Sequence, residues 1–339
     1  MGGLSIMSNR EVSSLYVLGG TQRSLLVKEE AEWNLYESAL ILKVDARSGA
    51  VRTCVEYKSP GDVRPHAHSA CLFKSGALAG DLLYACTNTE VLVFRLPAFE
   101  PVNRISLSCF NDLHHVTPCD DGTLLVVNTG LDMVVRITPE GELVEEWDVL
   151  GGPAWQRFSP EIDYRRIDST KPHRSHPNFA FQLNGDLWVT RMYQRDAFCL
   201  TDPDKRIDIA LESPHDGLVR GKEIYFTLVD GRVAVAGTDT MSIDRVMDFK
   251  TMDDPNTLLG WCRGVLPVGE DRLWVGFSRV RKTRFYENIL WVKHVLKEGM
   301  IEKPTHISLY DIGHERCLQE FDLEPHGMNT IYSIFPAND

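Results

Sequence analysis

The sequence predicts an all-β protein, a six-bladed β-propeller that makes one domain over residues 1–339. The main observation is a repeat in which an apolar run, a Gly/Asp turn and a second apolar run recur five times, as in GTLLVV, GDLWVT and DRLWVG. Short apolar runs bounded by such turn residues are typical of antiparallel strands. Two incomplete pieces of the same unit stand at the two chain ends. Together they would form a sixth blade and close the ring without leaving a long exposed sheet edge.

Each unit predicts four strands. The most regular one predicts strands at roughly 115–118, 123–128, 132–137 and 142–147. The four other complete units cover residues 70–107, 179–209, 217–249 and 265–321. In the closing blade, N-terminal strands near 15–17, 39–44 and 51–57 would join a C-terminal inner strand at 328–335.

Two segments interrupt the repeat. Residues 151–174 connect the third and fourth blades, and residues 282–303 are inserted into the sixth. In the second segment Phe285, Ile289 and Val292 follow a helical spacing that continues to Leu296, which predicts a short amphipathic helix. Long insertions often form lids, binding loops or interfaces. We therefore regard 282–303 as the candidate surface for a homo-oligomer.

Charge and cysteine usage exclude several classes of function. The chain has 36 Lys and Arg against 48 Asp and Glu, a net charge of −12, which disfavours binding to nucleic acid. No apolar run has the roughly 18 residues of a membrane helix, and Met1–Arg10 does not resemble a signal peptide. The eight Cys show no C-x-x-C spacing, which favours reduced thiols. We expect a cytoplasmic protein that binds neither nucleic acid nor membrane.

Seven of the eleven His precede a predicted inner strand, in five of the six blades. The sixth blade has Arg263 there, eight residues before Asp271, just as His114 stands eight residues before Gly122. Inner strands of a propeller run side by side around a central channel, so their entrances bring distant residues together. The seven His are His66, His68, His114, His115, His176, His215 and His326.

A ring of neutral imidazoles suits a divalent transition metal, here Zn²⁺ or Fe²⁺. The ligands that we expect are His68, His114, His176, His215 and His326. His66 and His115 are the alternatives within their pairs. An open coordination position would admit water or a small-molecule substrate, and the metal would act as a Lewis acid or lower the pKa of bound water to about 7.

Other polar residues are expected near the same rim. Arg263 would hold an anionic group of the substrate, Glu324 would act as a general base, and Asp112 would orient a His or act as an acid–base group. The competing interpretation is structural: each His can hydrogen-bond to a neighbouring strand, and Arg263 can form an ion pair between blades. The remaining four His are expected at the surface: His173, His294, His306 and His314.

The units PHGMNTI, LHHVTPCDDGTLLVVNTG and HPNFAFQLNGDLWVT resemble blades of NHL-type and gluconolactonase/strictosidine-synthase-like propellers, and of a bacterial propeller family of unknown function. The placement of His114, His215 and His326 with Arg263 is similar to that in peptidyl-α-hydroxyglycine α-amidating lyase. That resemblance implies a catalytic zinc at the blade entrances. The sequence departs from this lyase in lacking a secretory signal and a disulfide pattern.

Three hypotheses of function follow. The first is a metal-dependent enzyme with lyase, hydrolase or oxygenase chemistry on a small molecule. The second is a metal-free ligand-binding or scaffold propeller. The third is a metal-independent acid–base enzyme of the strictosidine-synthase-like type, using a carboxylate such as Glu324 or Asp112.

Overall fold

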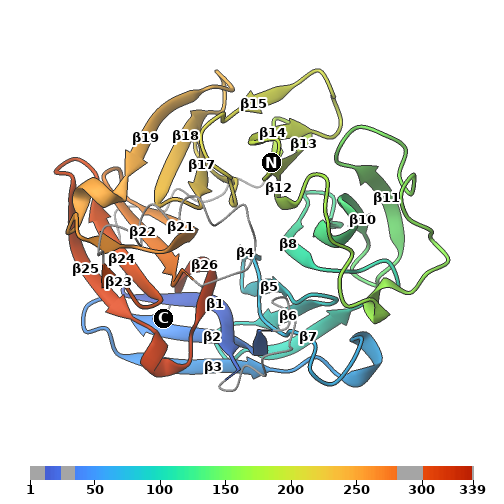
Figure 1. Cartoon of the computed structure of the whole chain (residues 1–339), viewed down its shortest axis with the longest axis horizontal. Coiled ribbons are helices and arrows are strands. Elements are labelled where there is room, and N and C mark those ends of the chain that lie inside the picture. Colours follow the sequence, from blue (N-terminus) through green and yellow to red (C-terminus); the bar gives the residue numbers. More distant parts are fainter. Residues whose placement is uncertain (1–11, 24–34, 281–300, 338–339) are drawn as a thin grey trace.

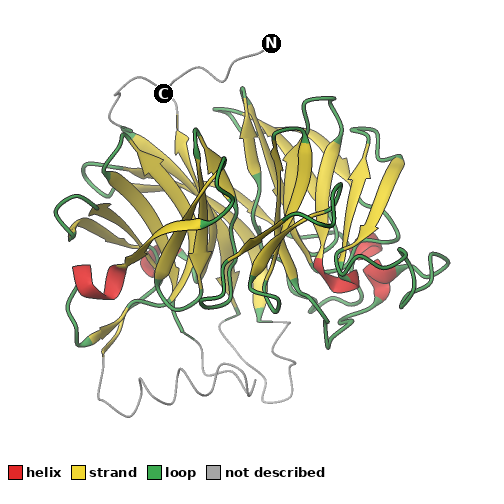
Figure 2. Cartoon of the chain, turned by 90° about the horizontal axis from the view of Figure 1, so that it is seen from above, coloured by secondary structure: helices red, strands yellow, loops and turns green. Residues whose placement is uncertain are grey.

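Four-stranded antiparallel sheets stand in a ring about a central axis in the computed structural model, which describes residues 12–23, 35–280 and 301–337 (Figure 1). The six sheets are the six predicted blades. Seen from the side, the strands run between the two faces of the ring, and loops gather on both faces (Figure 2). The predicted six-bladed β-propeller is therefore confirmed.

The blades follow one another in chain order, with the inner strand named first. Blade two has β4 (Ala77–Ala79), β5 (Leu82–Cys86), β6 (Val91–Arg95) and β7 (Glu100–Ile105). Blade three has β8 (Leu113–Pro118), β9 (Leu124–Asn128), β10 (Met133–Ile137) and β11 (Leu143–Asp148). Blade four has β12 (Pro177–Leu183), β13 (Asp186–Arg191), β14 (Asp196–Cys199) and β15 (Arg206–Asp208). Blade five has β16 (Leu218–Arg220), β17 (Glu223–Leu228), β18 (Arg232–Gly237) and β19 (Ile243–Asp248). Blade six has β21 (Trp261–Val268), β22 (Arg272–Ser278), β24 (His306–Asp311) and β25 (Arg316–Asp322).

Blade one closes the ring with strands from both chain ends. Its inner strand β26 (Thr330–Ala337) pairs with β1 (Ser14–Gln22). Strands β2 (Tyr36–Asp45) and β3 (Val51–Tyr57) complete the sheet. Because β1 hydrogen-bonds to β26 on one side and β2 on the other, the ring is held shut by a complete ladder, as the sequence predicted.

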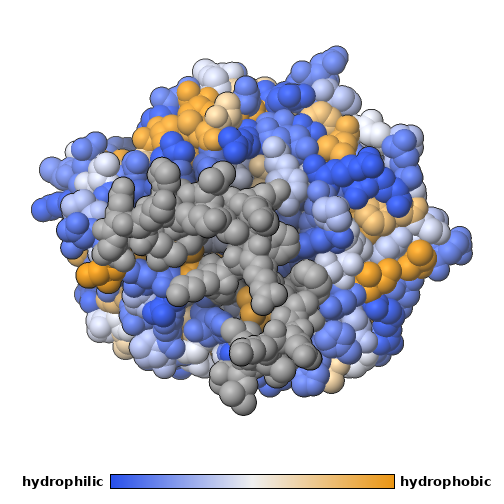
Figure 3. Space-filling view, viewed as in Figure 1, coloured by the Kyte–Doolittle hydropathy of each residue, from blue (hydrophilic) through white to orange (hydrophobic). Residues whose placement is uncertain are grey.

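The hydrophobic core lies between blades. Six main buried clusters each join two consecutive blades. Trp188 and Phe226, for example, pack between blades four and five, and Trp274 packs with Leu42 and Ile331 between blades six and one. Successive residues of a strand point to opposite faces of its sheet. Because each sheet packs between two neighbouring blades, its inner strands carry apolar residues on both faces. The described surface in the view of Figure 3 is mainly hydrophilic, with apolar residues in separate patches.

The helix predicted within 282–303 falls largely on residues 281–300, outside the described residues. The described end of that insertion, β23 (Ile301–Glu302), pairs in parallel with β20 (Thr257–Leu258). Over the described ranges, the helical elements are short 3-10 turns: η2 (Gly61–Val63), η3 (Thr129–Leu131), η4 (Tyr164–Arg166), η5 (Phe249–Met252) and η6 (Glu324–His326). None of these is long and apolar enough to span a bilayer.

Candidate functional site

A register shift at the entrance of the inner strands turns side chains toward the channel. In β8 the shift falls between Leu113 and His115, so His114 is the extra residue, and in β12 it leaves Asn178 in the same role. Strands β21 and β26 carry equivalent shifts around Arg263 and Tyr332. Such β-bulges re-aim one side chain out of the regular alternation.

The two remaining blades supply residues just before their inner strands. Lys74 lies three residues before β4, and His215 lies three residues before β16. The ring of His114 lies 5.9 Å from that of His215 and 6.3 Å from that of Tyr332, measured between centroids, and His215 lies 5.4 Å from Tyr332. Residues of blades three, five and one therefore meet across the axis. We call Lys74, His114, Asn178, His215, Arg263 and Tyr332 the channel ring.

His114 is buried, and its Nδ1 lies 2.7 Å from Asn178 Oδ1. The Asn178 amide nitrogen donates to Pro214 O at 3.0 Å, which orients its oxygen toward His114. His114 Nδ1 therefore donates in the neutral ring, and Nε2 carries the lone pair and faces Asp112. Burial, helped by the Lys74 ammonium, lowers the pKa of His114 to about 3. The imidazole is neutral at pH 7 and can accept a proton or bind a metal.

His215 has the same arrangement in blade five. Its Nδ1 lies 3.3 Å from Asp216 Oδ1, while its Nε2 is buried with no hydrogen-bond partner. Asp216 is itself held by the Thr227 hydroxyl and by Gly264 N, both at 2.8 Å from Oδ2. Burial, and then the nearby Arg263 cation, lower the pKa of His215 to about 4. A buried nitrogen without a partner is a feature that a ligand would satisfy.

His176 reaches the cluster from the loop before β12. Its ring lies 4.8 Å from that of His114, nearly at right angles, and its Nδ1 lies 2.8 Å from His173 Nδ1. Burial, and then the neighbouring His114, hold the pKa of His176 well below its usual value. The backbone there is left-handed, with φ of 56°.

Buried Asp132 fixes this unusual loop. Its Oδ1 accepts hydrogen bonds from Ser175 N at 3.0 Å and His176 N at 2.9 Å. Its Oδ2 accepts one from Arg174 N at 2.7 Å and pairs with the Arg157 guanidinium. A fully buried carboxylate that accepts several donors is a strong anchor. Sequence reasoning missed Asp132, since nothing in the sequence linked the β9–β10 turn to residue 176.

Buried Lys74 and partly exposed Asp112 form an ion pair beside His114. Asp112 Oδ1 contacts Lys74 Nζ and lies 3.7 Å from His114 Nε2. Burial acts to raise the pKa of Asp112, but the Lys74 ammonium, His114 and His173 together outweigh it and hold the pKa well below the usual value. The site thus contains a carboxylate that is ionised and balanced by one cation.

Arg263 has no acidic partner among the residues that the structure describes. Its guanidinium lies over the rings of Tyr332, at 4.7 Å, and Trp261, at 5.0 Å, and its Nε is buried without a hydrogen bond. Buried Arg191, in contrast, is paired with Asp196. The ion pair between blades that was the structural interpretation of Arg263 does not form there. A cation between two rings and beside His215 is suited to an anionic ligand.

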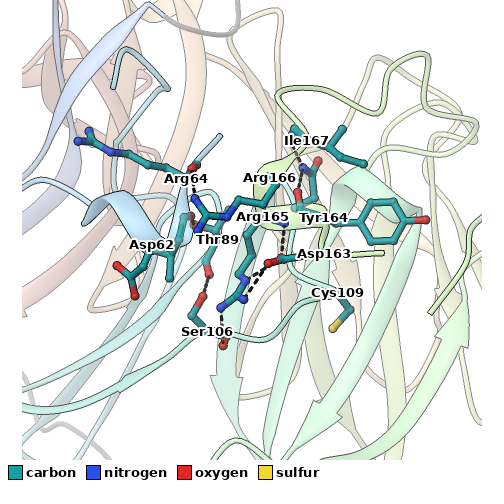
Figure 4. Close-up of polar contacts among 12 residues, drawn as sticks. Asp62, Arg64, Thr89, Ser106, Cys109, Asp163, Tyr164, Arg165, Arg166 and Ile167 are labelled. Atoms are coloured by element: carbon teal, nitrogen blue, oxygen red, sulfur yellow. Dashed lines mark hydrogen bonds and ion pairs between the residues drawn. The ribbon is translucent and has the colours of Figure 1, made fainter. Parts of the chain in front are cut away.

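The 151–174 connector, whose His173 contacts His176, is tied to the segments before blades two and three. Arg166 donates to the carbonyls of Gly61 and Arg64 at 2.8 and 3.0 Å, across the blade two loop, and Arg165 pairs with Asp163 (Figure 4). Tyr164 N donates to Ser108 O at 2.7 Å. These contacts fix the middle of the connector, and Asp132 fixes the loop that follows it. His173 and His176 lie between or beside these fixed points.

Some predicted site residues lie elsewhere. His66, His68 and His326 are exposed, and Nε2 of His66 lies 3.2 Å from Asp168. The Glu324 carboxylate is engaged by Arg279 at 2.8 Å and by Thr305 N at 3.0 Å. His115 is buried between blades, bonded through both ring nitrogens to the backbone of Gly76 and Ala180.

The sequence reasoning also placed four His at the surface. This is wrong for His173 and His306, which are 7% and 0% exposed. His173 is buried because the connector folds inward onto His176, and His306 because it stacks on Phe277 inside blade six. His314 is exposed, as expected. His294 lies outside the described residues.

The fit to a metal has two sides. In each of His114, His176 and His215 the Nδ1 atom is engaged by another group, which leaves Nε2 as the ligand atom. Protein metal sites hold their His ligands in this way. However, of the described residues only Asp253, Cys317 and Glu320 bring three ligand atoms within 4.8 Å of one another. A metal in the channel would have to draw the three rings inward.

Comparison with known proteins supports the fold. No protein-family model matches the sequence. No curated protein matches it either. The resemblance to NHL-type propellers and to the amidating lyase is thus not confirmed. The chain is similar in structure to a protein of unknown function from Bacteroides caccae, at 11% identity and a TM-score of 0.60 over 96% of this chain and 100% of that one.

Two further similarities are of the same kind. A chain of a nidogen/laminin complex is 10% identical, with a TM-score of 0.56 over 96% of this chain and 98% of that one. Virginiamycin B lyase from Staphylococcus aureus is a more distant neighbour, 13% identical with a TM-score of 0.42, over 70% of this chain and 69% of that one. At these identities the likeness concerns the fold alone.

Proposed function

We propose that this protein is a metal-dependent enzyme that acts on a small anionic molecule in the propeller channel, with a divalent transition metal held by Nε2 of His114, His176 and His215. The observation that carries the proposal is the pairing of each Nδ1: with Asn178, with His173 and with Asp216. These pairings fix the rings and leave three neutral nitrogens for one ligand.

The depressed pKa values support the same proposal. A metal competes with protons for imidazole nitrogen, and the pKa values of His114 and His215, about 3 and about 4, remove that competition above about pH 5. Zn²⁺ and Fe²⁺ both accept imidazole. When bound, such a metal supplies Lewis acidity or an activated water.

The chain's own residues then have distinct roles. Arg263 would bind the anionic group of the substrate, because its guanidinium has no acidic partner among the described residues and faces the channel rings. Asp112, 3.7 Å from His114 Nε2, would take up a proton near that ring, and the Lys74 ammonium keeps it ionised. The proposal assigns no role to Glu324, whose carboxylate is already engaged.

Metal analysis of protein purified without an affinity tag tests this proposal. We expect the metal content to fall by one equivalent per chain in a His176→Ala, His215→Ala double variant. His68→Ala and His326→Ala are matched controls, since both side chains are exposed and lie outside the channel ring. An unchanged metal content in the double variant would contradict the proposal. So would a loss of metal in His68→Ala and His326→Ala when the double variant keeps its metal.

A metal-independent acid–base enzyme is the second candidate. It is favoured by the Lys74–Asp112 ion pair beside His114 and by the separation of the His ligand atoms. The two candidates differ in one measurement. Turnover of an anionic substrate that survives exhaustive chelation, but is lost in Asp112→Asn, supports acid–base chemistry without metal.

A further inference from the structure

A second group of ligating side chains lies in the outer half of blade six, away from the channel ring. Asp253 follows η5, Cys317 and Glu320 lie on β25, and His306 begins β24. The ligand atoms of Asp253, Cys317 and Glu320 all lie within 4.8 Å of one another. Carboxylate, thiolate and imidazole are the ligand types that bind zinc in proteins.

His306 is the independent observation that points to a ligand. The side chain is completely buried, and its Nδ1 lies 2.7 Å from Pro304 O. Because a carbonyl can only accept, Nδ1 of the neutral ring carries the proton and Nε2 carries the lone pair. Nε2 makes no hydrogen bond, yet it lies 3.6 Å from Glu320 Oε2.

Two electron-rich atoms so placed repel each other unless a cation lies between them. Two ligands of one tetrahedral zinc, each bound at roughly 2.0–2.2 Å, stand about 3.3–3.5 Å apart. The separation of His306 Nε2 and Glu320 Oε2 is close to this. A backbone carbonyl on Nδ1 is also the usual support of a metal-bound His.

Lys303 shows that the cluster attracts positive charge. Its ammonium lies 2.8 Å from Asp253 Oδ2 and 2.6 Å from Glu320 Oε2. Among the described residues of this cluster, one ammonium faces two carboxylates. Its three contacts all go to carboxylate oxygens and none reaches His306 Nε2, whereas a divalent ion could bind that nitrogen and both carboxylates. Lys303 is on a long flexible stem and can release the carboxylates toward solvent.

We propose that Asp253, His306, Cys317 and Glu320 form a structural binding site for Zn²⁺ or a similar divalent transition metal, in competition with the Lys303 ammonium. Binding would convert the Cys317 thiol to a thiolate and release its proton to solvent. The metal would tie the turn after blade five to the outer strands of blade six. This site is independent of the proposed channel metal, since it shares no residue with it.

Cobalt is the probe, because a cobalt–thiolate bond gives a charge-transfer band in the near ultraviolet and the channel ring contains no Cys. We expect Co²⁺ titration of the full chain to produce this band, Cys317→Ser to abolish it, and Cys54→Ser to keep it. The band should also persist when His176 and His215 are both replaced by Ala, which separates this site from the channel site.

Lys303→Met provides the decisive variant, since it removes the competing cation and keeps the stem. We expect it to bind Co²⁺ at least tenfold more tightly than the wild-type chain, with the same band. The proposal is overturned if Lys303→Met gives no band at millimolar Co²⁺, or if the band survives in Cys317→Ser. Lys303→Met keeps the buried core of blade six, so we expect the variant to fold. Circular dichroism checks this before the titration.

Discussion

Each of the six blades contributes one side chain to the channel ring, near the entrance of its inner strand: Lys74, His114, Asn178, His215, Arg263 and Tyr332. A repeat position that serves packing alone tolerates only residues of similar size and polarity. Here the ring combines two cations, two imidazoles, an amide and a phenol. This mixture of residue types is what the proposed channel site requires, and uniform packing between blades does not require it.

The coupling between Arg263 and His215 is a direct test at the residue scale. Arg263 helps to hold the pKa of His215 at about 4, so Arg263→Gln should raise that pKa toward 6.5. The measurement is the pH dependence of the His215 ring resonances by NMR. Arg316→Gln, an exposed arginine in the outer strand of blade six, is the control and should leave the His215 pKa unchanged. An unshifted pKa in Arg263→Gln would show that burial alone depresses it.

At the scale of elements, the bulged entrance of β21 depends on Gly264. Its φ is +76°, and a Cβ there would lie 3.2 Å from Ser333 Cα in β26. Only glycine allows this conformation without strain and also lets two inner strands approach so closely. The approach of β21 to β26 is what brings Arg263 over Tyr332.

Gly264→Ala should lower the free energy of unfolding by about 1–3 kcal/mol because of backbone strain, and further because of the contact with Ser333. Gly80→Ala is the matched control, since Gly80 has φ of +62° but open space around the position of a Cβ. Urea unfolding of both variants measures the difference. Equal losses would mean that the close approach of β21 and β26 contributes nothing.

The loop that presents His176 is held by Asp132 and not by a strand ladder. Asp132→Ala removes the acceptor of three backbone N–H groups and leaves Arg157 without its partner. We expect a loss of about 3–5 kcal/mol in unfolding free energy and a weaker channel metal site. Asp202→Ala, an exposed turn residue on the β14–β15 connection, should change neither.

At the scale of the whole molecule, the site exists only when the ring is closed. Tyr332 comes from the C-terminal strand, and Lys74, His114 and His215 come from blades two, three and five. The ring contacts between Tyr332 and the two His cross the channel, so they depend on the pairing of β26 with β1. The channel ring is therefore complete only when β26 is paired with β1.

Buried neutral His should make the whole fold sensitive to acid. The pKa values of His114 and His215 are about 3 and about 4 in the folded chain, against 6.5 when unfolded, so below pH 6.5 the unfolded chain binds more protons. Each His should then reduce the free energy of unfolding by about 2 kcal/mol at pH 5 compared with pH 8. Urea unfolding at both pH values measures this. A His114→Gln, His215→Gln double variant should show a smaller loss between pH 8 and pH 5.

The residues expected at the rim differ from the channel ring for a specific reason. Counting back from the hairpin turn leads to His114, His215 and Arg263, which all belong to the channel ring. In blade four, offsets of seven to nine residues to the turn fit both His176 and Asn178, and the bulge of β12 places Asn178 in the ring. In blade one the second strand lies at the other end of the chain, so there was no hairpin turn to count from, and His326 was chosen in place of Tyr332. In blade two the apolar run before Lys74 was read as the inner strand, which favoured His68.

The sequence by itself determined the six-bladed ring, the strands shared between the chain ends and the presence of polar residues at the blade entrances, because these depend on turn residues and apolar periodicity that are local. Only the tertiary structure decided which side chains meet. One-residue bulges, the Asp132 anchor of the His176 loop and the pairing of Lys74 with Asp112 join residues that are far apart in the chain, and no local pattern encodes such distances.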